Sequence, residues 1–168
     1  MKLELKRIRA AAAAAAVDKA EKYRDLNQPF EAESICRDVL EAAPEHQEAL
    51  IVLLLALTDQ FEMEPGSNVA AARTVLGRLK GAYEREYYGG IICERWGKRL
   101  LDRRAPGTGP MIHDWLRDAM DCYERAEGLR PAGDDDAILR WNTVARLITQ
   151  HEHVRPAAEG TRVEMQLE

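Results

Sequence analysis

The stretch AAAAVDKAEKYRDLNQPFEAESICRDVLEAAP, residues 13–44, decides the fold class of this chain. Nothing in its first half breaks a helix, the Asn-Gln-Pro turn at 27–29 puts a proline where a second helix begins, and Pro44 ends that helix. The stretch LRDAMDCYERAEGLRP, residues 116–131, ends in the same way at Pro131. Helical hairpins that recur along a chain cannot bury their apolar faces alone, so they are expected to stack on one another.

The remaining segments also have the pattern of helices. Apolar residues recur at helical spacing, and no segment shows the alternation typical of a strand. Residues 46–61 are apolar on nearly all sides, which predicts a helix buried between its neighbours. Gly89 and Gly90 lie inside a helical pattern and indicate either a kink or a close backbone contact. The expected helices cover residues 10–26, 30–43, 46–61, 69–79, 82–104, 111–129 and 137–151.

Charge and composition exclude several classes of protein. The formal net charge of −5 gives no overall attraction to nucleic acid or to an anionic membrane. No apolar run is long enough for a membrane span, and the cysteines form no metal or disulfide pattern, so we expect a cytoplasmic protein with reduced thiols. Residues 31–64 are rich in acids and residues 73–104 are rich in bases. Solvated helix faces explain this polarity, and two surfaces for oppositely charged partners are the alternative.

Several polar residues lie in patterns that resemble metal-binding or phosphate-binding motifs. His151 and His153 have the spacing of a metal-binding pair, but surface histidines at a helix end are the simpler interpretation. Aspartates 134–136 are explained by helix capping, and the Gly-Thr-Gly loop at 106–110 by a plain connector, since no Lys-Ser/Thr follows it. No serine or cysteine has a base at helical spacing. We therefore expect no enzyme, no metal site and no cofactor.

The helix expected over residues 82–104 is both basic and aromatic. Such a surface stacks bases and neutralises phosphates in proteins that bind single-stranded nucleic acid. Acidic residues alternate with the basic ones here, and Tyr83 and Tyr87 have the spacing of a packed pair. We therefore do not expect nucleic acid as the partner, and an RNA-binding helical repeat is the lesser alternative.

The residues at recurring positions of these hairpins resemble the tetratricopeptide repeat. The small, tyrosine, alanine and proline positions of that pattern fall on Ala20, Tyr23, Ala32 and Pro44 in the first hairpin, and on Ala119, Tyr123, Ala126 and Pro131 in the third. The middle hairpin keeps the leucines of the pattern but lacks the closing proline. The resemblance implies an all-α, right-handed α-solenoid of about three hairpins with a C-terminal capping helix. The repeat domain would cover residues 1–152, followed by a flexible C-terminal tail, residues 153–168.

The same resemblance implies a protein-binding adaptor or scaffold that holds a partner peptide or helix in the concave groove of the repeat array. Groove-facing residues are expected from the first helix of each pair, and mixed charges there favour a partner chosen by charge pairing around an apolar anchor. The alternative is a structural subunit that forms a homodimer or hetero-oligomer through residues 46–61 and the fifth helix. The candidate partner-binding residues are Glu21, Arg24, Asp25, Asp59, Glu94 and Lys98.

Overall fold

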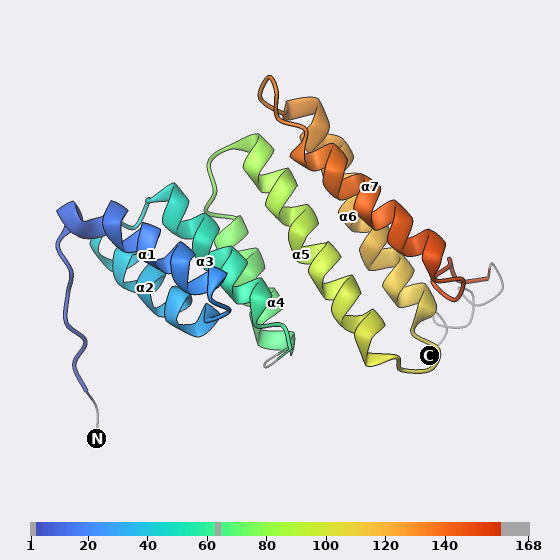
Figure 1. Ribbon diagram of the computed structural model, residues 1–168, viewed down its shortest axis with the longest axis horizontal. Helices are drawn as coiled ribbons and strands as arrows, with labels where there is room; N and C mark the ends of the chain where they lie inside the picture. Colours follow the sequence, from blue (N-terminus) through green and yellow to red (C-terminus); the bar gives the residue numbers. More distant parts are fainter. Residues whose placement is uncertain (1–2, 63–64, 159–168) are drawn as a thin grey trace, which may run out of the picture. The chain divides into compact units, whose positions relative to one another are not determined.

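The structure is a computed structural model that describes residues 3–62 and 65–158, and within these ranges all regular secondary structure is helical (Figure 1). The all-α class predicted from the sequence is therefore confirmed. A 3-10 helix, Ala10–Ala12, comes first. The α-helices are α1 (Ala13–Asp25), α2 (Pro29–Ala42), α3 (Gln47–Asp59), α4 (Pro65–Leu76), α5 (Ala82–Arg103), α6 (Gly109–Leu129) and α7 (Asp136–Gln150).

The chain divides into two compact units, whereas the sequence led us to expect one repeat domain over residues 1–152. The N-terminal unit comprises residues 1–88, and the C-terminal unit comprises residues 89–168. The division falls inside α5, directly before the glycine pair at residues 89 and 90. Each unit has its own buried apolar core.

The N-terminal unit is built from successive helices that pack on their neighbours. α1 packs on α2 and also on α3, and α3 lies between α2 and α4. Ala20 and Ala32, the small positions of the first hairpin, have no exposed surface, so the backbones of α1 and α2 can approach closely. Leu50, Leu54 and most other apolar side chains of α3 are buried, which confirms the prediction that this helix is covered on several sides.

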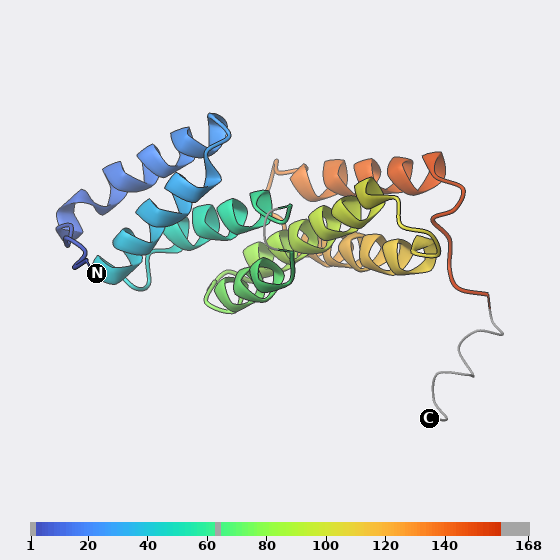
Figure 2. The ribbon, with the colours of Figure 1, turned by 90° about the horizontal axis from the view of Figure 1, so that it is seen from below.

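The C-terminal unit contains α5 from Gly89 onward, α6 and α7. α6 and α7 run antiparallel side by side (Figures 1 and 2). Gly90 lies so close to α6 that a Cβ atom there would be 2.5 Å from Cε1 of Tyr123. A Cβ atom at Gly97 would be 2.8 Å from Cδ2 of Leu116. Of the two expectations for the glycine pair, the close contact is confirmed, and it sets the distance between α5 and α6.

Two helices begin earlier than predicted, because their first turns contain a proline or a glycine. α4 begins at Pro65 rather than at residue 69, because proline is compatible with the first position of a helix. Asn68 lies within α4, and its side-chain amide donates to the carbonyl of Gln60 at 3.3 Å. α6 likewise begins at Gly109, before Pro110.

The segment after α7 is packed over its first residues, where the sequence suggested a flexible tail. Val154 is only 4% exposed, and its N–H donates to the carbonyl of His151 at 2.8 Å. The carbonyl oxygen of His153 lies against Gly109, at a place that a Cβ atom would occupy. The rest of the predicted tail, residues 159–168, lies outside the described residues.

Candidate functional site

The structure brings together two of the predicted partner-binding residues in the N-terminal unit. Arg24 of α1 donates from Nε to Oδ2 of Asp59 of α3 at 2.8 Å. Their side chains are only 19% and 23% exposed, so this ion pair ties α1 to α3 rather than standing free in solvent. Glu21 and Asp25 are exposed on α1. The α1–α3 face therefore carries a fixed ion pair with two exposed carboxylates beside it.

Two large apolar side chains stand in solvent where α1 turns into α2. Leu26 is 68% exposed and Phe30 is 66% exposed. Asn27 between them has φ 57°, a left-handed conformation that asparagine tolerates in tight turns. Single exposed apolar residues are common, but apolar patches rimmed by charge are typical of interaction sites, and these two residues lie four positions apart among charged neighbours in the sequence. We call Leu26 and Phe30 the α1–α2 tip.

Glu94, the fifth predicted contact residue, is fully buried in the C-terminal unit, so the expectation that it lines an exposed groove is wrong. The hydroxyl of Tyr123 on α6 donates to Oε2 of Glu94 at 2.6 Å. Nη1 of Arg140 on α7 lies 3.3 Å from Oε1, and Nζ of Lys98 donates to the same oxygen from the next turn of α5. The carboxylate joins all three helices of the unit, and Lys98 is tied to it.

The pKa of Glu94 is set by two opposing effects. Burial alone raises the pKa of a carboxyl group, because the charged form loses its hydration. Hydrogen bonds from Lys98 and Tyr123, together with the positive charges of Lys98 and Arg140, outweigh burial and hold the pKa below its usual value. Glu94 is therefore ionised at neutral pH. A buried charge with this set of partners holds the three helices in one arrangement, since removing one partner leaves a buried charge uncompensated.

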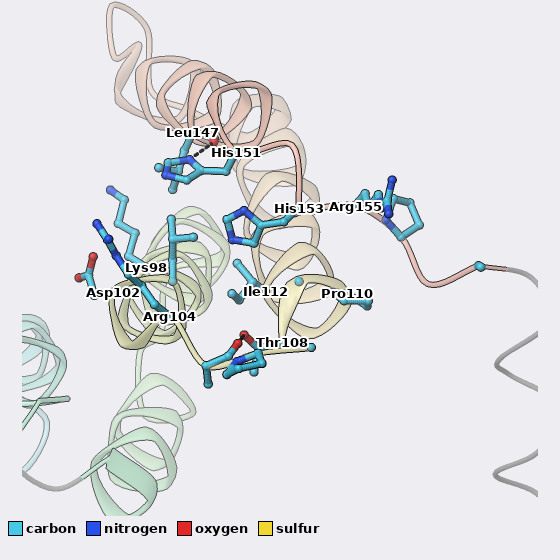
Figure 3. Close-up of a pocket in the computed structure, with 17 residues that line it drawn as sticks. Lys98, Asp102, Arg104, Thr108, Pro110, Ile112, Leu147, His151, His153 and Arg155 are labelled. Carbon is cyan, nitrogen blue, oxygen red and sulfur yellow. Dashed lines mark hydrogen bonds between the residues drawn. The ribbon is translucent and has the colours of Figure 1, made fainter.

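A cavity of about 1280 Å³ lies in the C-terminal unit, where α5 ends and α6 begins (Figure 3). Its walls come from the end of α5, the loop into α6, and the segment that follows α7. Lys98, Asp102 and Arg104 lie on one side of it in Figure 3, and His151 and His153 lie on the other. Apolar walls are supplied by Leu101, Ile112 and Leu147.

The cysteines are free thiols, and two of them lie in the core. Cys36 has no exposed surface and Cys93 is 9% exposed. Burial raises the pKa of Cys36 to about 12, so its thiol stays protonated at neutral pH and is a poor nucleophile. Cys122 is partly exposed and accepts a hydrogen bond from Arg125 at 3.2 Å. Among the described residues, no group of three or more His, Cys, Asp or Glu side chains could hold a metal ion.

Sequence reasoning missed the partners of Glu94 and the residues that gather around the cavity. Tyr123 was predicted only as a packing position, and Arg140 was not singled out. The glycine at position 90, opposite the ring of Tyr123, was the available signal that α5 and α6 meet there. His151 and His153 were read as surface residues, and their place beside the α5–α6 loop depends on contacts that the sequence pattern does not contain.

None of the described helices has both the length and the apolarity to cross a membrane. The predicted packing of the tyrosines on α5 is present: the rings of Tyr83 and Tyr87 stack with their centres 5.6 Å apart.

No known protein family, curated protein or solved structure matches this chain.

Proposed function

We propose that this protein is a non-enzymatic adaptor that holds a partner peptide or helix on its N-terminal unit. In this proposal the hairpins of that unit belong to a right-handed, tetratricopeptide-like solenoid, and the α1–α3 face is part of its concave surface. The α1–α2 tip supplies the apolar anchor for the partner.

The packing of the N-terminal unit supports this proposal. In a stack of hairpins, the first helix of one pair lies beside the first helix of the next, and here α1 contacts α3 as well as α2. The ion pair between Arg24 and Asp59 joins the same two first helices. A surface whose side chains are already fixed loses little conformational entropy when a partner binds.

The observation that carries the proposal is the exposure of Leu26 and Phe30 next to acidic residues. Covering each of these side chains with a partner would contribute about 1.5–3 kcal/mol. Asp25 and Glu31 flank the tip in the sequence and are exposed, while Arg24 is neutralised by Asp59. With Glu21, Asp25 and Glu31 exposed and Lys22 the exposed cation in the last turn of α1, the charge near the anchor is net negative. The partner that fits this surface carries an apolar residue flanked by lysine or arginine.

The test is affinity capture from native lysate with a variant that carries both Leu26→Asp and Phe30→Asp. Both side chains are largely solvent-exposed, so the variant should fold normally and lose the captured partner. Leu139→Asp is the matched control, because Leu139 is 61% exposed but lies in the C-terminal unit. The proposal fails if the double variant captures the same proteins as the wild type, or if the control loses them equally.

The two alternatives have less support from the structure. The apolar side chains of α3, which the alternative of an oligomerising structural subunit relies on, are mostly buried inside the N-terminal unit. An RNA-binding surface would need tyrosines that offer their ring faces to bases, whereas Tyr83 and Tyr87 stack on each other.

A further inference from the structure

The cavity of the C-terminal unit has a charge opposite to that of the whole protein. Its lining contains the permanent cations Arg104 and Arg155 and the single carboxylate Asp102, while the charge of Lys98, also in the lining, is offset by Glu94. The formal net charge of the whole chain is −5. A concave site lined mainly by one sign of charge concentrates ligands of the other sign, so this cavity favours anions.

The wall that carries the histidines is held in place rather than trailing from α7. Val154 anchors it in the core, and His151 Nδ1 lies 2.9 Å from the carbonyl oxygen of Leu147 (Figure 3). A carbonyl only accepts hydrogen bonds, so Nδ1 carries the proton. Nε2 is then an acceptor in the neutral ring and donates to an anion only when the ring is protonated on both nitrogens. Gly109 has no side chain, which lets the backbone of His153 close against the start of α6.

The third wall contributes main-chain donors and apolar surface. The first N–H groups of a helix have no partner within the helix, and the positive end of its dipole attracts anions. At the start of α6, the N–H of Ile112 is already bonded to the carbonyl of Thr108 at 2.9 Å, and Pro110 has none. Of the other residues in this first turn, Gly109 lines the cavity and Met111 does not. Leu101 and Leu147 add apolar surface next to these groups.

We propose that this cavity binds a small organic phosphate, with the phosphate group between Arg104 and the two histidines and the apolar part against Leu101, Ile112 and Leu147. A phosphate fits better than a carboxylate because the basic side chains come from opposite walls. A tetrahedral anion can accept donors from several directions, whereas a carboxylate accepts them in one plane. This site is separate from the partner-binding surface proposed for the N-terminal unit.

The probe for this proposal is phenyl phosphate, titrated into the full chain by isothermal titration calorimetry at neutral pH. We expect saturable binding with a Kd below about 1 mM. Benzoate keeps the ring but carries a carboxylate, and inorganic phosphate lacks the ring. Each should therefore bind at least about tenfold more weakly than phenyl phosphate. Absence of saturable binding of phenyl phosphate, or equal binding of benzoate, would overturn the proposal.

A pair of variants locates the site. Arg104→Gln combined with His153→Gln should weaken binding of phenyl phosphate about tenfold or more, because both exposed side chains line the cavity. Arg103→Gln removes the neighbouring exposed charge, which does not line the cavity, and should leave the affinity unchanged. Tryptophan fluorescence checks folding, since Trp96, Trp115 and Trp141 all lie in this unit. Equal weakening by both variants would mean general charge attraction and would reject the site.

Discussion

At the scale of single residues, the carboxylate of Glu94 has the largest consequence for the C-terminal unit. It is fully buried, yet it is charged, because Lys98, Tyr123 and Arg140 surround it. Any arrangement of the helices that breaks these contacts leaves a buried charge uncompensated, which costs free energy. Glu94 therefore specifies how α5, α6 and α7 meet.

This role makes the stability of the C-terminal unit depend on pH in a defined direction. The pKa of Glu94 is lower in the folded chain than its usual value, so the unfolded chain takes up the proton first as the pH falls. The stabilisation is complete above the unfolded pKa of about 4.3 and is lost as the pH falls further, through the folded pKa. Urea unfolding followed by tryptophan fluorescence measures this unit alone, because all tryptophans lie in it.

The matched variant is Glu94→Gln, which keeps the shape of the side chain and removes its titration. Wild type should lose more of its free energy of unfolding than Glu94→Gln when the pH is lowered from neutral to below the unfolded pKa. Other carboxylates titrate in both proteins, so the difference between them belongs to Glu94. Parallel pH profiles would show that this carboxylate does not hold the helices together.

At the scale of the helices, glycine decides where α5 touches α6. A Cβ atom at Gly90 would lie 2.5 Å from the ring of Tyr123, whose ring atoms are packed and whose hydroxyl is bonded to Glu94. Gly128 lies in α6, and a Cβ atom there would meet nothing within 4 Å. The same substitution at these two positions therefore separates packing from helix propensity.

Gly90→Ala should destabilise the C-terminal unit by about 1–3 kcal/mol, because the added methyl group forces α5 and Tyr123 apart. Gly128→Ala should be neutral or stabilising by up to about 1 kcal/mol, because alanine favours the helix. The midpoints of urea unfolding, read from tryptophan fluorescence, give both values. If Gly90→Ala is as stable as Gly128→Ala, then the close approach of α5 and α6 is not a constraint.

Local sequence patterns predicted the helices well, but they could not predict which side chains meet between the helices. The bodies of all the predicted helices are present, because apolar spacing and Pro or Gly at turns act within a few residues. Helix starts at Pro65 and Gly109 were missed, because proline is compatible with both a loop and a first helical turn. Glu94 was misplaced because its partners lie 29 and 46 residues away, and its own neighbours resemble a solvated charged face.

At the scale of the whole molecule, the two units have different proposed tasks. The N-terminal unit presents an apolar tip beside acidic residues, which is the basis of the adaptor proposal. In the C-terminal unit, the contacts of the buried Glu94 carboxylate hold the helices together, and a basic cavity lies at the end of α5. A substitution in one unit can therefore be compared with a control substitution of an exposed residue in the other unit.

The most direct test of the adaptor proposal replaces Phe30 with a photo-crosslinking phenylalanine analogue and irradiates the protein in native lysate. We expect a discrete covalent adduct with a partner from position 30, and none from the same analogue at Leu139, which is exposed to a similar degree. Mass spectrometry of the adduct should place the crosslink in a segment with an apolar residue flanked by lysine or arginine. An absence of adducts at position 30, or the same adducts from both positions, would contradict the claim that the α1–α2 tip binds a partner.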